Sequence, residues 1–236
     1  MAVQIIAWMA SGLYFSLIPI TEIRGAHLTA APESLESGQL GSLPGPDQIS
    51  GLLNEQMGDD WSLGNLRLVS VNGQSLWRVG GESAGKSFTR LVAADGESFV
   101  PRLSQQGAKS RAGDWLLEPA EPVSIDLIES VPAGSEFRGR ELPVWRVAYS
   151  EPESVNLYID PWTGELLARR TDRWRLFDFL WMLHIMDFDT RDDFNHPLLQ
   201  ISAALGLIIA LSGVIFWAIT TKLFRRRNKL LASPTK

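Results

Sequence analysis

The sequence predicts a membrane protein of the α+β class, in which two transmembrane helices flank a mainly β region. Uncharged apolar segments occupy the two ends of the chain, and a dense group of basic residues follows the second one. Between them, apolar and polar residues alternate as in β-strands, and Asn-Gly and Asp-Gly pairs mark turns. The 236 residues suffice for one or two small folded units besides the spans.

The two apolar segments, residues 2–20 and 197–221, contain no charged side chain. About 20 apolar residues are needed to cross the hydrocarbon core of a bilayer. We therefore predict transmembrane helices over residues 1–21 and 196–221. A cleaved signal peptide is the alternative for the first segment, with Thr29-Ala30-Ala31 as the cleavage site. Against it, no basic residue precedes the apolar run, and charged residues interrupt the stretch before that site.

The basic cluster sets the predicted orientation in the membrane, because dense positive charge beside a span is retained in the cytoplasm. It lies in the tail, residues 222–236, and consists of Lys222, Arg225, Arg226, Arg227 and Lys229. With two spans, both termini lie in the cytoplasm and the central region faces the periplasm. The predicted location is therefore a bacterial inner membrane.

The charge of the chain is unevenly distributed. Six basic residues and no acidic residue follow Thr221, which leaves 16 basic and 27 acidic residues before it, a balance of −11. An acidic domain repels phosphate backbones, so no nucleic-acid partner is expected. The chain contains no cysteine, which rules out disulfides, thiolate metal sites and cysteine nucleophiles.

The central region begins with a predicted linker over residues 22–46, where Pro, Gly, Ser and Ala dominate from residue 29 onward. Asp47 can cap a helix that runs from Gln48 to Met57 and ends at Gly58. Strands are then predicted over Leu66–Val71, Leu76–Val79 and Phe88–Ala93, with turns at Asn72-Gly73 and Asp95-Gly96.

An internal repeat divides this region into two modules. Leu76-Trp77-Arg78-Val79 is followed by an apolar strand and Asp95-Gly96-Glu97, and Val144-Trp145-Arg146-Val147 by Leu157-Tyr158-Ile159-Asp160 and Thr163-Gly164-Glu165. Each copy indicates a strand, a return strand and a tight turn, so we predict tandem α+β modules over residues 47–102 and 103–170. The candidate helix of the second module spans Ser104–Ala112.

A further helix, within residues 171–188, is predicted to begin at Asp172 and to end near Met186. Its aromatic face carries Trp174, Phe177, Leu180, Trp181 and His184, while Arg175 and Asp178 fall on another face. Such a helix is expected to lie in the membrane interface, anchored by Trp174, Phe177 and Trp181. Packing of the aromatic face against the β modules is the alternative, and both can hold together.

Several of these motifs resemble known families. Both copies of the repeat, and above all LYIDPWTGEL at residues 157–166, resemble the PepSY domain. The tail from Trp174 through His184-Ile185-Met186-Asp187 into the last span resembles the PepSY-associated transmembrane helix family. Segments 11–15, 19–20 and 24–28 resemble the end of that family's first span. The likeness covers nearly the whole chain.

The resemblance implies an inner-membrane protein with periplasmic PepSY modules. Members of the wider family are associated with iron and siderophore uptake, and some with ferric reduction, with haem held by membrane histidines. PepSY modules elsewhere inhibit or assist the folding of secreted proteases. Family members usually open with a basic, histidine-containing segment, whereas residues 1–6 here contain neither. Either the start has been lost or misassigned, or a haem ligand from that position is missing.

The candidate cofactor-binding residues are the three histidines, His27, His184 and His196. The predicted topology places them near one membrane face, where two neutral imidazoles can bind haem iron or hold a transition metal. His184 is the best candidate, because it lies on the aromatic face and Asp187 follows one turn later as a potential orienting partner. The alternative is that these histidines only bridge the apolar and wet zones of the interface.

Other chemistry is weakly indicated. The acidic run of Asp187, Asp189, Asp192 and Asp193 suits hard cations but is expected to be a solvated connection. Residues 80–87 end like a phosphate-binding loop but lack its first glycine, and are expected to form a turn. The sequence contains no nucleophile elbow and no zinc-protease motif, so catalysis is expected only with a bound cofactor.

Residues and resemblance together favour an auxiliary or interaction subunit that contacts the lipid bilayer and a membrane or periplasmic protein partner, within iron acquisition or membrane electron transfer. The alternatives are a haem-binding redox protein that promotes ferric reduction, and a periplasmic protease inhibitor or regulator. Two spans are few for a self-contained transporter, so a homodimer or a larger complex is expected.

Overall fold

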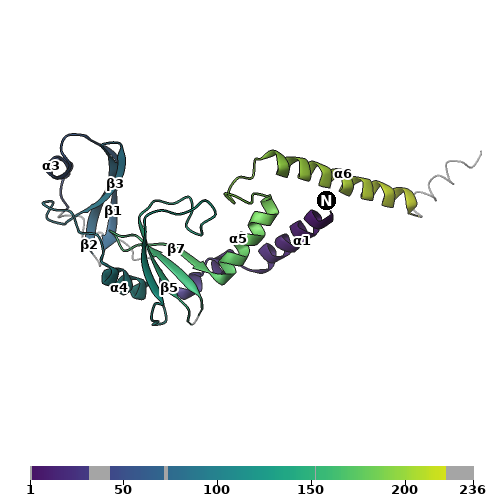
Figure 1. Ribbon diagram of the computed structural model, residues 1–236, viewed down its shortest axis with the longest axis horizontal. Helices are drawn as coiled ribbons and strands as arrows, with labels where there is room; N and C mark the ends of the chain where they lie inside the picture. Colours follow the sequence, from purple (N-terminus) through teal and green to yellow (C-terminus); the bar gives the residue numbers. More distant parts are fainter. Residues whose placement is uncertain (1, 32–42, 72–73, 152, 222–236) are drawn as a thin grey trace, which may run out of the picture. The chain divides into compact units, whose positions relative to one another are not determined.

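The computed structural model describes residues 2–31, 43–71, 74–151 and 153–221. They form two compact units (Figure 1). The helical unit contains residues 2–19 and the described residues from 176 onward, and the sheet unit contains residues 20–175. The predicted Asn72-Gly73 turn and the basic cluster after Thr221 lie outside the described residues.

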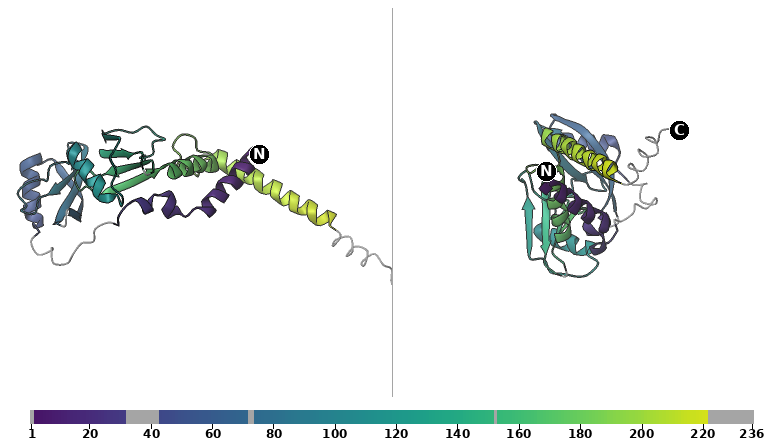
Figure 2. Two further views of the ribbon diagram at one scale, coloured as in Figure 1. Left: turned by 90° about the horizontal axis from the view of Figure 1, so that it is seen from below. Right: turned by 90° about the vertical axis from the view of Figure 1, so that its right-hand side faces the viewer.

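The helical unit contains one helix that is long and apolar enough to cross a membrane, within the described part of the chain. This helix, α6 (Pro197–Thr220), is the helix before the grey C-terminal trace in Figure 2. It has 24 residues, and only 6% of its most apolar stretch is buried. The first apolar helix, α1 (Ala2–Leu17), has 16 residues, which corresponds to about 24 Å and is shorter than a hydrocarbon core of about 30 Å. The structure therefore supports the second predicted span but leaves the first unconfirmed.

Two short helices, α2 (Ile20–Ile23) and the 3-10 helix η1 (Ala26–Leu28), open the sheet unit. Ile23 is buried, and its carbonyl accepts a hydrogen bond from the hydroxyl of Thr171 at 3.2 Å. This contact ties the start of the sheet unit to its last strand.

A three-stranded antiparallel sheet follows, in the order β1 (Trp61–Val71), β2 (Gln74–Ser83) and β3 (Lys86–Val92). Helix α3 (Pro46–Met57) covers one face. The predicted cap, Asp47, is wrong: Gly45 is the N-cap, and its amide donates to the Gln48 side chain at 2.9 Å. The core between helix and sheet consists of Ile49, Leu52, Leu53, Val79, Phe88 and Val92.

The second sheet has four antiparallel strands, in the order β4 (Ser124–Ile128), β5 (Val144–Tyr149), β6 (Val155–Ile159) and β7 (Leu166–Thr171). Helix α4 (Gln105–Trp115) packs on one face (Figure 1). Its N-cap is Ser104, whose hydroxyl accepts from the Gly107 amide at 3.1 Å. The second helix thus begins where the sequence placed its only candidate, although it extends to Trp115.

In each half of the unit a helix precedes an antiparallel sheet, which has three strands in the first half and four in the second. One tryptophan has the same role in both halves. The indole Nε1 of Trp77, on β2, donates to the carbonyl of Pro44 at 3.0 Å. The indole Nε1 of Trp145, on β5, donates to the carbonyl of Leu103 at 3.1 Å. Each acceptor lies two residues before the first residue of its helix. Both indoles thus fix where a helix enters its sheet.

The other face of the four-stranded sheet is covered by the chain between β4 and β5. Phe137 is fully buried and stacks on Tyr158, with ring centroids 4.5 Å apart. The neighbouring Glu136 accepts hydrogen bonds from Asn156, from the Tyr158 hydroxyl at 2.7 Å and from Arg175 Nε at 2.9 Å. Burial alone would raise the pKa of Glu136, but these hydrogen bonds outweigh it and hold the pKa below its usual value.

Candidate functional site

His184, the strongest candidate from the sequence, lies near the end of α5 (Asp172–Ile185). The helix begins where the sequence predicts, but Asp172 is its first residue and not its cap. The hydroxyl of Thr171 accepts the amide of Trp174 at 3.1 Å instead. Successive turns of α5 then carry Phe177, Trp181 and His184 along one side.

Within the helical unit, this side of α5 faces α1. The Phe15 ring lies 4.8 Å from Phe177, 6.3 Å from Trp181 and 5.8 Å from His184, between centroids. The rings of Trp181 and His184 are parallel within 4°, at 6.3 Å. The aromatic face is therefore occupied by contacts with the first apolar helix, an arrangement that neither sequence-based alternative included.

The imidazole of His184 has a defined partner in α1. Its Nδ1 lies 2.7 Å from the hydroxyl of Ser11, which is fully buried. That hydroxyl also lies 2.7 Å from the carbonyl of Ala7. Because a carbonyl only accepts, the Ser11 proton points to Ala7, and the hydroxyl oxygen then accepts the Nδ1 proton of His184. The tautomer is thereby fixed with the proton on Nδ1.

This tautomer leaves a lone pair on His184 Nε2. Among the described residues, Nε2 has no hydrogen-bond partner. Burial lowers the pKa of His184 below its ordinary value of 6.5, so the ring stays neutral at pH 7. A neutral imidazole with a free Nε2 is the form that binds a transition metal or haem iron.

Two further contacts hold the end of α5 against α1. The indole of Trp8 donates to the carbonyl of His184 at 2.7 Å, and the Gln4 side chain donates to the carbonyl of Leu183 at 3.1 Å. The last carbonyls of a helix lack partners within the helix. Side chains of α1 supply those partners here, so the backbone at His184 is positioned as well as its ring.

Asp187 does not orient His184. Its carboxylate instead closes the loop between α5 and α6, where it accepts from the Thr190 hydroxyl and from four backbone amides, those of Asp189, Thr190, Asp192 and Asp193. The hydrogen bond from Thr190 and those from the amides hold the pKa of Asp187 well below its usual range. The expectation for Asp187 was therefore wrong, and Ser11 takes the orienting role.

His196 caps α6. Its Nδ1 accepts from the Leu199 amide at 3.4 Å, and its Nε2 lies 2.9 Å from the carbonyl of Ile185, to which it donates. Both ring nitrogens are occupied, so His196 as placed here does not have a lone pair for a metal. The signal in the sequence was the position of His196 directly before Pro197, where caps occur.

His27 belongs to the sheet unit, where its Nε2 lies 3.3 Å from Glu153 Oε2. Across the described ranges, no group of three or more His, Asp or Glu residues is arranged to hold a metal ion. The predicted pairing of two histidines around haem or a metal therefore stays a prediction, and His184 is the histidine whose free ring nitrogen lies next to an aromatic wall.

The remaining residues of α5 divide between the two units. Trp174 lies in the sheet unit, 4.0 Å from the guanidinium of Arg170. Asp178 was expected on the polar face but is only 4% exposed and pairs with Arg191 Nη1 at 2.6 Å. This buried pair was missed because Arg191 lies in a loop, where no periodicity indicates which side chains turn inward.

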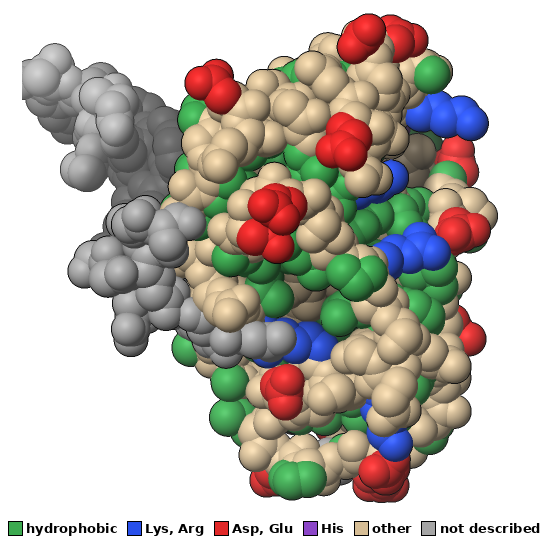
Figure 3. Space-filling model, turned by 90° about the vertical axis from the view of Figure 1, so that its left-hand side faces the viewer, with side chains coloured by type: hydrophobic (Ala, Val, Ile, Leu, Met, Phe, Trp, Pro, Cys, Tyr) green, Lys and Arg blue, Asp and Glu red, His purple; other side chains and the backbone are tan. Residues whose placement is uncertain are grey.

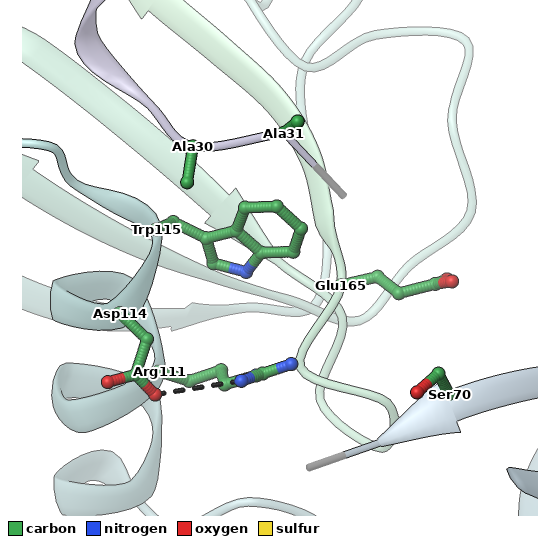
Figure 4. A pocket seen from close by; sticks show the side chains of 7 residues that line it. All are labelled: Ala30, Ala31, Ser70, Arg111, Asp114, Trp115 and Glu165. Atoms are coloured by element: carbon green, nitrogen blue, oxygen red, sulfur yellow. Dashed lines mark ion pairs between the residues drawn. The ribbon is translucent and has the colours of Figure 1, made fainter. Parts of the chain in front are cut away.

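The sheet unit contains a second candidate, a cavity of about 150 Å³ beside Trp115 (Figure 4). Arg111 Nε is buried and has no hydrogen-bond partner among the described residues, and Nη1 lies 3.6 Å from Asp114. The guanidinium points along the cavity toward Ser70 (Figure 4). Asp114 and Glu165 also line the cavity, and two carboxylates against one guanidinium disfavour an anionic ligand.

The Asp-Pro-Trp-Thr-Gly-Glu part of the repeat motif forms the turn after β6. Asp160 is 2% exposed, and its Oδ1 accepts the amides of Trp162 and Thr163 at 2.8 and 2.9 Å. The indole of Trp115 donates to the carbonyl of Gly164 at 2.9 Å. The residues of this motif therefore have a structural role, because they form and pack the turn.

Comparison with protein families matches residues 59–232 to the family described as PepSY-associated TM region. This stretch covers most of the chain. The chain belongs to that family. The resemblance seen in the sequence is thereby confirmed, together with a membrane protein of the α+β class. No curated protein and no solved structure matches the chain.

The PepSY-associated TM region begins before β1 and continues through α6, so it includes His184 and His196 but not Ser11 or His27. The hydrogen bond that fixes the His184 tautomer thus joins a residue inside the family region to one outside it. The matched region therefore contains α5, which carries His184, but not α1, which carries Ser11.

Proposed function

We propose that this PepSY-associated protein is a two-pass inner-membrane protein with both termini in the cytoplasm and the sheet unit in the periplasm. In this arrangement it acts as an auxiliary subunit that binds a membrane or periplasmic protein partner. The observation that carries the proposal is the exposed apolar surface of α6. Nearly all of its 24 residues are exposed. Contact between so large an apolar surface and water is unfavourable, so we expect lipid to cover it.

The first helix supports a second contact with lipid. One side of α1 packs on α5 through Ser11 and Phe15, while the other exposes large apolar residues, namely Val3, Ile6, Met9, Leu13 and Leu17. Because α1 is shorter than the hydrocarbon core, the span in this proposal also includes the residues after α1, up to residue 21.

The orientation follows from charge. The basic residues after Thr221 stay in the cytoplasm, whereas the sheet unit holds 22 acidic and 15 basic residues between positions 20 and 175. Figure 3 shows that Asp and Glu side chains are spread over one face of the molecule, interspersed with Lys and Arg. Such a mixed charged surface suits an aqueous compartment.

A binding role is supported by a groove of about 550 Å³ that is lined by the first sheet and by loops next to the second sheet. It is bordered by Arg90 and Arg102, by Glu82, Glu129 and Glu141, and by the ring of Trp162. Arginine and aromatic side chains are enriched in protein recognition surfaces, whose rims are polar. The link to iron acquisition or electron transfer rests on the family resemblance.

A second function is favoured by His184, namely a haem-binding redox protein. The free Nε2, the neutral ring and the aromatic wall fit one axial ligand to haem iron. The His196 nitrogens are both engaged, so a pair of axial histidines does not fit within the helical unit. Purified protein with added haemin should show a Soret band that His184→Ala removes and His27→Ala keeps; a spectrum of free haemin alone excludes this function.

The absence of cysteine allows a direct test of the proposed topology. Single cysteines are introduced at Glu97, which is exposed on the sheet unit, and at Ser233 in the tail. A membrane-impermeant maleimide should label the first in intact spheroplasts and the second only after permeabilisation. The reverse labelling would overturn the topology. Affinity capture from native membranes then tests the subunit role, which predicts a co-purifying partner at fixed stoichiometry.

A further inference from the structure

A groove of about 320 Å³ lies in the sheet unit beside η1. Its floor is formed where the chain after η1 pairs with the chain after α4: the Leu117 amide donates to the carbonyl of Leu28 at 3.1 Å. The apolar part of the lining consists of Leu28, Leu116, Leu117 and Val155. Leu117 is an exposed large hydrophobic residue, so the floor is open to a ligand.

The polar lining is strongly asymmetric in charge. Glu118, Glu151 and Glu153 border the groove, and no Lys or Arg is among its described lining residues. Glu153 lies 3.3 Å from His27 Nε2. Glu118 and Glu151 are exposed and form no ion pair within the described chain. The rim therefore carries three carboxylates, and two of them, Glu118 and Glu151, have no cationic partner among the described residues.

Tyr149 supplies a separate sign of an unfilled site. Its side chain is 3% exposed and lines the groove, yet its hydroxyl has no hydrogen-bond partner in the described residues. The hydroxyl oxygen is therefore available to a hydrogen-bonding ligand in the groove. Burial, with the nearby charge of Glu121, raises the pKa of Tyr149 to about 12, so the hydroxyl keeps its proton at neutral pH.

We propose that this groove binds an organic cation on an aliphatic stem, an alkyl ammonium or guanidinium group. The stem packs on Leu28, Leu117 and Val155, and the charged end lies between Glu118, Glu151 and Glu153. The Tyr149 hydroxyl offers its oxygen as an acceptor to the cation. Two sources present this chemistry: a lysine or arginine side chain of a polypeptide, and a free alkyl diamine.

A metal ion is a poorer occupant of the same lining. A hard cation takes six or more oxygen ligands or keeps a shell of water, and gains nothing from an apolar floor. The described carboxylates are not arranged as a ligand group around one point. An organic cation uses both the charge of the rim and the apolar floor, and its size matches a small-ligand groove.

The test uses the full-length protein in detergent micelles and three probes at equal ionic strength. The probes are Nα-acetyl-lysine methylamide for the polypeptide source, cadaverine for the free amine, and the uncharged Nα-acetyl-norleucine methylamide as the isosteric control. Calorimetric titration should give saturable binding of a cationic probe at one site per chain. The norleucine probe should bind about tenfold more weakly or less, because charge-assisted hydrogen bonds are lost.

Three variants place the site. Glu118→Gln and Glu151→Gln alter exposed carboxylates of the rim and should each weaken binding about threefold to tenfold. Tyr149→Phe keeps the buried ring and should weaken binding about threefold. Glu97→Gln removes an exposed carboxylate away from the groove and should leave affinity unchanged. Thermal unfolding of each variant checks that the fold is kept.

Stronger binding of the lysine derivative assigns the polypeptide source, and stronger binding of cadaverine assigns the free amine; either supports the site. Three results overturn it. These are no saturable binding of any cation, equal binding of the norleucine probe, and rim variants whose affinity equals that of Glu97→Gln.

Discussion

Arg78 and Asp160 join the two sheets of the sheet unit, with Arg78 Nη2 3.1 Å from Asp160 Oδ2. Arg78 comes from the middle strand of the first sheet, and Asp160 from the turn after β6 in the second. Both belong to the repeated motif, one to each copy. The ion pair thus joins one copy of the motif to the other, whereas the corresponding arginine of the second copy, Arg146, pairs with Asp126.

Removal of the Asp160 charge should destabilise the sheet unit. Asp160→Asn keeps an acceptor for the amides of Trp162 and Thr163 but leaves the Arg78 guanidinium without its buried partner. A broken buried pair costs about 3 kcal/mol, whereas a surface pair costs less than about 1 kcal/mol. The matched control is Asp126→Asn, because Asp126 pairs with Arg146 at 2.9 Å near the surface. Urea unfolding of the full-length variants measures the difference, and equal losses would contradict the assigned role.

Glu136 should make stability depend on pH in the acid range. Its pKa is lowered in the folded state, so its contribution is present above the ordinary value of 4.5 and is lost as the pH falls through the folded pKa. Glu136→Gln should therefore reduce stability at pH 7, by about 1–3 kcal/mol for the lost charge-assisted bonds. As the pH falls through the lowered pKa of the folded state, the variant and the parent should converge. A difference that stays constant down to the acid unfolding of the parent would show that packing and not ionisation is responsible.

His184 should titrate below its ordinary value, since burial disfavours its charged form. The neutral ring therefore contributes to the stability of the fold above pH 6.5, and this contribution is lost as the pH falls through the lowered pKa of His184. NMR of histidine-labelled protein measures the three titrations, and His184→Gln assigns the signal. Ser11→Ala should change the chemical shift and the tautomer signature of His184 but not those of His27. If Ser11→Ala leaves the His184 spectrum unaltered, the hydrogen bond between them is not formed in solution.

Gly164 should not tolerate a side chain. It has a φ of 69°, and an added Cβ would lie 2.7 Å from Arg111 Cγ. Gly139 has a φ of 67°, but a Cβ there would meet no described atom within 4 Å. Gly139→Ala thus measures the backbone strain alone, about 1–2 kcal/mol, and Gly164→Ala should cost more because the arginine must move. Equal melting temperatures for the two variants would show that Arg111 moves without cost.

The elements predicted best were those with a strong sequence signal. Alternation located the strand around Trp77, the internal repeat located the strand around Trp145, and a continuous uncharged apolar run located α6. The strand β4, Ser124–Ile128, was not predicted. All five of its residues are half-buried, which gives no clean alternation between an inner and an outer face.

The caps were misplaced by one or two residues for a local reason. Asp47 and Asp172 are good capping residues, but Gly45 and Thr171 lie at the positions where the backbone leaves the helix. Several polar residues next to a helix start satisfy the same rule, and only the backbone dihedral angles choose among them.

The His184 site was predictable only in part. The aromatic spacing on α5 identified His184 from local sequence. Its partner Ser11 lies 173 positions earlier in an uncharged segment, and no local pattern indicates which residue of α1 would face the imidazole. The roles of His196 as a helix cap and of Asp187 as the acceptor of a loop were not predicted, because both side chains suit a ligand and a cap equally well.

In each half of the sheet unit, one indole N–H, that of Trp77 or Trp145, holds the start of the helix against the sheet. Phenylalanine and leucine have no N–H in their side chains and could not make this hydrogen bond. The two helices, PDQISGLLNEQM and QQGAKSRAGDW, have almost nothing in common, whereas both strands contain Trp-Arg-Val. A search for further copies of this unit in other chains should therefore start from the tryptophan strand.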